Sequence, residues 1–115
     1  MAILFGALAL TFALWVVSAV FYYSMGELWL REFRRQYPVQ WEGAGQPSFL
    51  SASIAGRGYW RPIRAENFFR YREYATLPDV SLIQRAEKVK RWQTMMWSLL
   101  AGWLCLAGLI AFLVR

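Results

Sequence analysis

Two acidic side chains offer the most direct route to chemistry in this sequence. Glu66 and Glu73 are seven residues apart, so on a helix they would share one face. Paired carboxylates of this kind can act as general acid and base. Arg70 and Arg72 stand beside them, however, and such neighbours favour solvated ion pairs. Because no glycine-rich phosphate loop or metal-ligand spacing accompanies the pair, we predict that the protein is not an enzyme.

The residues that most metal and nucleophilic sites need are missing from the sequence. There is no histidine, which excludes imidazole metal ligands, histidine-ligated haem and Ser-His or Cys-His catalysis. The single cysteine, Cys105, cannot form an intrachain disulfide. Its neighbours are apolar, and a thiol in apolar surroundings is inert. We therefore expect no cofactor and no bound metal.

The most informative tract interleaves cations with aromatic rings. Such a tract can bind anionic lipid headgroups, can form a protein interface rich in Trp, Tyr and Arg, or can cover the protein's own helices, and the residues leave these alternatives open. The net charge of +6 does not require a nucleic-acid partner, because no nucleic-acid motif accompanies it. The candidate lipid- or partner-binding residues are Arg57, Tyr59, Trp60, Arg61, Arg64, Phe68, Phe69, Arg70 and Arg72.

Two uncharged runs must position this tract. Residues 2–26 and 92–114 contain no charged side chain, in a chain of 115 residues that is 58% hydrophobic. Each run exceeds the roughly 20 apolar residues that cross a ~30 Å hydrocarbon core as a helix. We therefore predict an all-α membrane protein with two transmembrane helices. Because no Lys or Arg precedes the first run, we expect it to be a retained span and not a cleaved signal peptide.

Both spans are predicted to extend beyond the bilayer and to form a hairpin, as helices over about residues 2–37 and 79–114. Pro38 is the natural end of the first helix, because proline disfavours helix in the residue before it. Pro78-Asp79 is typical of the start of the second. The connecting segment has too few apolar residues to close a core of its own. We expect it to be irregular, with at most a short helix near residues 65–74. The predicted parts of the chain are residues 1–37, 38–78 and 79–115.

The placement of charge predicts the orientation. Of the 13 Lys and Arg residues, 12 lie between Arg31 and Arg91, and Arg115 alone lies outside that range. The positive-inside rule then places the connecting segment in the cytoplasm and both termini on the other side of the membrane. Neither run carries an ionisable group near its middle, which disfavours a stand-alone ion carrier.

Each predicted span carries a stripe of small residues on one face. Small residues let helix backbones approach closely, which is how helices associate in lipid. The simpler interpretation is that the two stripes pack on each other inside the hairpin, and the alternative is that one stripe docks on a partner protein. The predicted helix-packing residues are Ala2, Gly6, Ala9 and Ala13 in the first span and Ser98, Ala101, Gly102, Cys105 and Gly108 in the second.

The stretch that leads into the second span has a distinctive order of charges. It reads Phe69-Arg70-Tyr71-Arg72-Glu73 and then Leu82-Ile83-Gln84-Arg85-Ala86-Glu87-Lys88-Val89-Lys90-Arg91. This order, over residues 69–114, resembles the universal stress protein B family, whose members have a span at each end and a basic cytoplasmic middle. The resemblance implies a bacterial inner membrane, a stress-related or accessory role, and no catalytic residues.

These features together predict a non-catalytic accessory or scaffold subunit of a larger membrane complex. The chain offers apolar surface, small-residue stripes and no chemistry of its own. A self-assembling, holin-like or stress-related membrane protein is the first alternative, and a membrane-surface module that binds anionic lipid through the basic tract is the second. The expected partners are therefore an integral membrane protein and anionic lipid headgroups, with a homo-oligomer left open and no nucleic acid.

Overall fold

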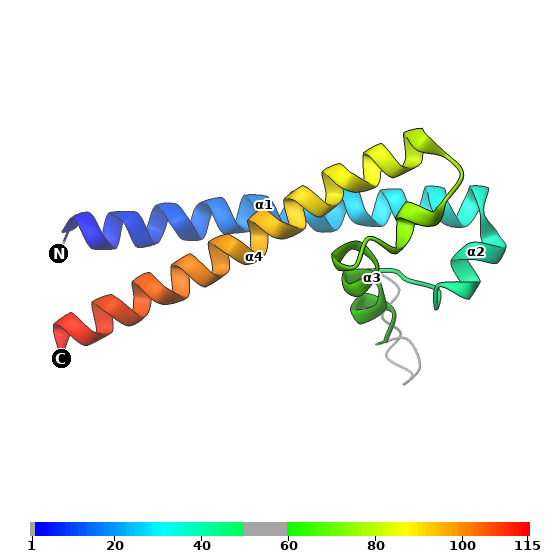
Figure 1. The fold of residues 1–115 in the computed structure, drawn as a ribbon. Helices are drawn as coiled ribbons and strands as arrows, with labels where there is room; N and C mark the ends of the chain where they lie inside the picture. The colour runs from blue at the N-terminus through cyan, green and yellow to red at the C-terminus, as the bar shows by residue number, and fades with distance from the viewer. Residues whose placement is uncertain (1, 50–59) are drawn as a thin grey trace.

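Two long helices dominate the computed structural model, which describes residues 2–49 and 60–115. Helix α1 (Ala2–Gln36) and helix α4 (Val80–Val114) have 35 residues each and pack against one another. Helix α2 (Pro38–Gly43), helix α3 (Trp60–Arg70) and the 3-10 turn η1 (Glu73–Thr76) gather at one end of this pair. Both termini lie at the opposite end (Figure 1). The prediction of an all-α hairpin with two long apolar helices is thus confirmed.

The ends of the long helices follow from local chemistry. Tyr37, with φ of −133°, leaves the helical conformation before Pro38, and Pro38 then occupies the first turn of α2. At the start of α4 the side chain of Asp79 accepts a hydrogen bond from the backbone N–H of Leu82 at 3.2 Å, which caps the helix. The connecting segment is more regular than predicted, because α2, α3 and η1 all lie within it.

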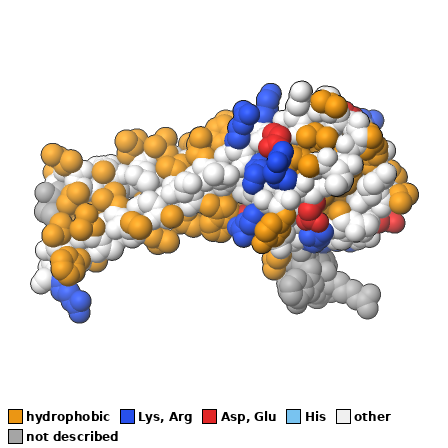
Figure 2. Space-filling view, in the orientation of Figure 1, with side chains coloured by type: hydrophobic (Ala, Val, Ile, Leu, Met, Phe, Trp, Pro, Cys, Tyr) orange, Lys and Arg blue, Asp and Glu red, His pale blue; other side chains and the backbone are white. Residues whose placement is uncertain are grey.

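The apolar parts of α1 and α4 are almost entirely uncovered by protein. A helix of 35 residues is about 52 Å long, whereas the hydrocarbon core is about 30 Å thick. In each helix an apolar stretch of 18 residues, with mean hydropathy of 2.3 in α1 and 2.2 in α4, is only 6% buried. A core helix of a soluble protein would be mostly buried. Figure 2 shows hydrophobic side chains along the helix pair and most of the charged side chains gathered at the end where α2 and α3 lie.

The seam between α1 and α4 includes large and polar side chains, most of them spaced three or four residues apart. Phe21 stacks on Trp92 with ring centroids 4.9 Å apart, and Phe12 lies 6.0 Å from Trp103. Steps of three and four residues keep one face of each helix turned toward the other, as in a coiled coil. Buried seam residues are Ser18, Tyr22, Gly26 and Trp29 in α1, and Leu82, Ala86, Val89, Gln93, Met96 and Ile110 in α4.

The small-residue stripes do not lie in this seam. At about 100° per residue, each stripe is about half a turn away from the seam on its own helix. A methyl group added to Gly6, Gly102 or Gly108 would meet no neighbouring helix within 4 Å. The interpretation that the stripes pack on each other is therefore wrong, because bulkier side chains occupy the contact. All nine stripe residues are exposed: Ala2, Gly6, Ala9, Ala13, Ser98, Ala101, Gly102, Cys105 and Gly108.

Gly26 is a position at which a neighbouring ring comes so close to the backbone that only glycine fits. A Cβ added there would lie 2.7 Å from the ring of Phe49 and 3.4 Å from Val89. The absence of a side chain at this position thus lets Phe49 reach the seam, where its ring contacts Tyr22 and Tyr23 edge-on at centroid distances of 5.3 and 5.2 Å. The connecting segment is therefore held against the point at which the apolar part of α1 ends.

An aromatic core joins the connecting segment to the protruding ends of α1 and α4. We call residues 27–49 and 60–91 the cap. Trp29 is at its centre, with the rings of Phe33, Phe68, Phe69 and Tyr74 at centroid distances of 5.3 to 6.1 Å. The indole N–H of Trp29 donates to the backbone carbonyl of Leu82 at 2.8 Å. The apolar residues of the connecting segment therefore form a core together with the long helices. This agrees with the prediction that they are too few to close a core of their own.

Candidate functional site

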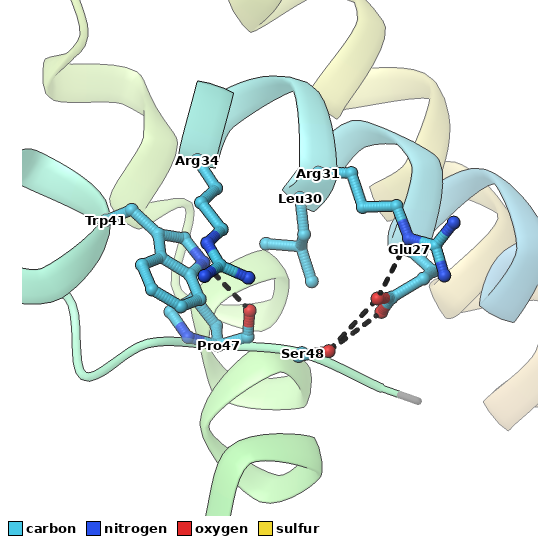
Figure 3. Close-up of a pocket in the computed structure, with 7 residues that line it drawn as sticks. All are labelled: Glu27, Leu30, Arg31, Arg34, Trp41, Pro47 and Ser48. Atoms are coloured by element: carbon cyan, nitrogen blue, oxygen red, sulfur yellow. Dashed lines mark hydrogen bonds and ion pairs between the residues drawn. The ribbon is translucent and has the colours of Figure 1, made fainter. Parts of the chain in front are cut away.

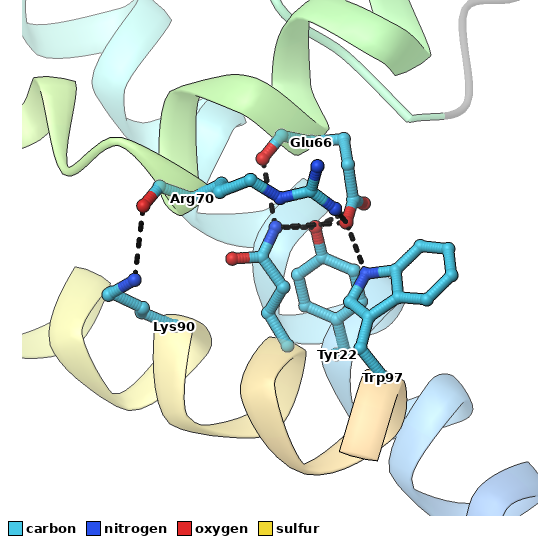
Figure 4. A network of polar contacts seen from close by, with 6 residues as sticks. Tyr22, Glu66, Arg70, Lys90 and Trp97 are labelled. Atoms are coloured by element: carbon cyan, nitrogen blue, oxygen red, sulfur yellow. Dashed lines mark hydrogen bonds and ion pairs between the residues drawn. The ribbon is translucent and has the colours of Figure 1, made fainter. Parts of the chain in front are cut away.

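A polar cluster centred on Glu66 lies where α3 meets both long helices (Figure 4). We call Tyr22, Glu66, Arg70, Gln93 and Trp97 the Glu66 cluster. The hydroxyl of Tyr22 donates to Oε2 of Glu66 at 2.7 Å, while Gln93 Nε2 and Trp97 Nε1 donate to Oε1 at 3.0 and 2.5 Å. Arg70, one turn further along α3, has Nη2 at 3.6 Å from Oε1. One carboxylate thus ties three helices together.

The amide of Gln93 connects the Glu66 cluster to the seam between α1 and α4. Its Nε2 donates to the hydroxyl of Tyr22 at 3.0 Å and to the backbone carbonyl of Glu66 at 2.8 Å. Lys90 adds a second link to α3, since its Nζ donates to the carbonyl of Arg70 at 3.1 Å. Both carboxylate oxygens of Glu66 already accept hydrogen bonds from protein. This arrangement positions α3 against the two long helices.

The two candidate acid/base carboxylates are not brought together. Helix α3 ends at Arg70, and Arg72 adopts a left-handed conformation with φ of 53°, so Glu66 and Glu73 do not share a helical face. Glu73 instead accepts hydrogen bonds from the two terminal nitrogens of Arg64, at 2.8 and 2.5 Å. The predicted ion pairing is thus correct in kind for both acids, although the partner of Glu73 is Arg64 and not Arg72.

A buried carboxylate, Glu27, anchors the chain that follows α2 (Figure 3). The hydroxyl of Ser48 donates to its two oxygens at 3.0 and 3.2 Å, and the backbone N–H of Phe49 donates to Oε2 at 2.8 Å. Nearby, the guanidinium of Arg34 lies 4.6 Å from the ring centroid of Trp41. The pocket here has a volume of about 210 Å³ and is lined by Glu27, Leu30, Arg31, Arg34, Trp41, Pro47 and Ser48.

The predicted basic-aromatic tract is divided between the interior and the surface of the cap. Phe68 and Phe69 are buried, so the prediction that they contact lipid or a partner is wrong. Their rings complete the core because α3 turns them toward Trp29. Arg64 is half-buried and contacts the cap itself, since its Nε donates to the carbonyl of Ala44 at 2.6 Å. Of the three alternatives for this tract, these residues follow the one in which it covers the protein's own helices.

The remaining tract residues are spread over different places. Arg61 donates to the side-chain oxygen of Gln46 at 2.8 Å. Arg70 and Arg72 are exposed, and Arg72 pairs with Glu87. Trp60 is the first residue of α3, while Arg57 and Tyr59 lie outside the described residues. Contact of these residues with lipid or a partner stays a prediction.

Sequence reasoning missed the Glu66 cluster, although a signal for it exists. Tyr22 and Gln93 both occupy seam positions in the spacing of three and four residues. Polar side chains at such positions need a buried partner, because an unpaired buried polar group costs free energy. The spacing therefore indicates that a polar group from elsewhere in the chain must reach the seam, but it does not indicate Glu66.

Comparison with known protein families, with curated proteins and with solved structures gives no match. The resemblance to the universal stress protein B family therefore stays a prediction that rests on the charge order of residues 69–114. Within residues 2–49 and 60–115, no three His, Cys, Asp or Glu side chains lie close enough together to hold a metal ion. The main feature of this molecule is its architecture, in which the cap packs at one end of a pair of apolar helices that the rest of the chain leaves uncovered.

Proposed function

We propose that this protein is a non-catalytic accessory subunit of a larger membrane complex, in which the outer faces of α1 and α4 bind an integral membrane partner. The observation that carries the proposal is the outward position of both small-residue stripes. Larger side chains already close the hairpin, so the stripes are available for a helix from elsewhere. Close backbone approach at small residues is how helices associate in lipid. The cap supports this role by fixing the pair from one side.

The proposed location is a bacterial inner membrane, with the cap in the cytoplasm and both termini outside. The support is the uncovered apolar surface of α1 and α4 together with the cationic cap, which the positive-inside rule retains on the inner side. The resemblance to the universal stress protein B family favours the same membrane.

A labelling experiment tests this orientation. A single cysteine introduced at the exposed position Tyr71 in a Cys105→Ser chain is expected to escape an impermeant maleimide added to intact cells. It should react when inverted membrane vesicles expose the cytoplasmic side. An Arg115→Cys chain is the matched control and should show the reverse pattern. Labelling of the cysteine at position 71 from outside would contradict the proposed orientation.

The partner interaction is tested by adding bulk to a stripe. Gly102→Leu is expected to reduce the amount of protein that co-migrates with a large assembly after gentle detergent extraction by about tenfold, since helix packing in lipid contributes about 1–2 kcal/mol. The fold should be unaffected, because nothing packs at Gly102.

Leu104→Trp is the control for this variant, because it adds bulk on another exposed part of α4. Its co-migration should equal that of the wild-type chain. Migration of the wild-type chain as a monomer would contradict the proposed function. Migration as a homo-oligomer would contradict it too, and would favour the self-assembling alternative.

A further inference from the structure

A groove crosses the seam at the level where the uncharged stretches of α1 and α4 end. It has a volume of about 480 Å³, and its described walls come from these two helices alone. Met25 precedes the first charged residue of α1, and Val89 lies three residues before Trp92, where the uncharged run of α4 begins. The described lining residues are Met25, Leu28, Trp29, Glu32, Arg85, Lys88 and Val89.

The groove is apolar at one end and cationic at the other. Along α1, Met25 and Leu28 stand nearer the apolar stretch and Glu32 further from it, a distance of about 10 Å along the helix from Met25. Along α4, Val89 is nearer the apolar stretch, and Lys88 and Arg85 follow in the outward direction. A molecule with an apolar tail and an anionic head would match this gradient in both polarity and direction.

The two cations of the groove are available to such a head. Within the described part of the chain, neither Arg85 nor Lys88 forms an ion pair, and both side chains are exposed. The carboxylate of Glu32 is already occupied, since Arg35 and Gln36 both donate to it. Those hydrogen bonds, with a smaller contribution from the charge of Arg85, lower the pKa of Glu32. Within the described part of the chain, both cations of the groove are thus outside any ion pair.

We infer that this groove binds one anionic phospholipid of the inner leaflet, with the phosphate at Arg85 and Lys88 and an acyl chain against Met25, Leu28 and Val89. Cationic side chains beside a membrane attract anionic headgroups, at about 1 kcal/mol each. The lipid would fill a hollow that the cap leaves uncovered on the seam. The inference rests on the membrane orientation of the proposed function, but it does not require the protein partner.

The test uses the purified full-length chain in detergent and native mass spectrometry with phosphatidylglycerol or with phosphatidylcholine of the same acyl chains. Phosphatidylglycerol is expected to remain bound at lower lipid concentration than phosphatidylcholine. Arg85→Gln/Lys88→Gln should weaken phosphatidylglycerol binding about 30-fold, which corresponds to about 2 kcal/mol. Leu28→Gln, which keeps both cations, should also weaken it, because the site must hold a chain as well as a phosphate.

Arg34→Gln/Arg115→Gln is the matched control, since it removes two charges outside the groove. Its phosphatidylglycerol affinity should stay within about threefold of the wild-type value. Equal affinity of the groove variant and the control would overturn the inference, and so would equal retention of the two lipids. Displacement by an equal concentration of inorganic phosphate would overturn it as well, because the groove would then hold a free anion. Intact lipid binding without co-migration would contradict the proposed function alone.

Discussion

Replacing Phe69 by alanine is expected to lower the free energy of unfolding of the cap by about 3–5 kcal/mol, the usual cost of removing a buried phenyl ring. Phe69 is 0% exposed. Its ring stacks on Phe49 at 6.2 Å and meets Trp29 and Tyr22 edge-on at 5.5 and 6.4 Å. Alanine would leave a cavity among residues of α1, α3 and the chain before it.

The effect can be measured by denaturant titration in detergent, with tryptophan fluorescence as the probe, because Trp29 contacts Phe69 directly. Tyr71→Ala is the matched control. It removes an aromatic ring two residues away whose side chain is 69% exposed, and its effect should be within about 0.5 kcal/mol of zero. Similar losses in the two variants would contradict the position of Phe69 in the core.

Replacing Glu66 by alanine is expected to cost about 3 kcal/mol and to release α3 from the helix pair. The change removes the carboxylate that accepts hydrogen bonds from Tyr22 and Trp97, and it removes one of the three acceptors of Gln93. A buried donor left without a partner costs about 1–3 kcal/mol. Because water can reach part of this cluster, we expect the total cost of the substitution to stay near the low value of about 3 kcal/mol. Arg70 is exposed and loses only a long ion pair.

Hydrogen exchange measured by mass spectrometry provides the readout. In the Glu66→Ala chain the amides of α3 should exchange about 100-fold faster, if most of the 3 kcal/mol appears as easier local opening. The amides in the apolar part of α4 should be unchanged. Glu42→Ala removes an exposed carboxylate of α2 and should leave α3 protected. Equal α3 protection in these two variants would show that Glu66 does not hold the helix.

The long helices could be predicted from the sequence because their causes are local. The absence of charge over residues 2–26 and 92–114 fixes the apolar stretches, and Pro38 and Asp79 act within one turn of the helix ends that they define. The core of the cap has no local cause. Phe68 and Phe69 are buried by Trp29, about forty residues away in the sequence, and no short window contains both sides of that contact.

The position of the stripes could not be predicted for a different reason. In a soluble helix the apolar face is the buried one, but lipid is as apolar as a helix interface, so hydrophobicity does not separate the two faces of a span. Small size favours close approach to some helix without indicating which one. What does distinguish the seam is its polar members, because Tyr22 and Gln93 need hydrogen-bond partners that lipid lacks. The need for hydrogen-bond partners therefore indicates that the contact between the two helices lies on the face opposite Gly6 and Gly102.

The contact between Trp29 and Leu82 has a consequence for biosynthesis. The indole of Trp29 needs a carbonyl 53 residues downstream, and the aromatic rings around it come from segments translated in between. While the ribosome is still producing those segments, the face of α1 that packs on them has no partner from its own chain. Its outer stripe, by contrast, is complete from the outset. In the proposed complex, a partner helix would therefore find the stripe of α1 complete before the rest of the hairpin has been made.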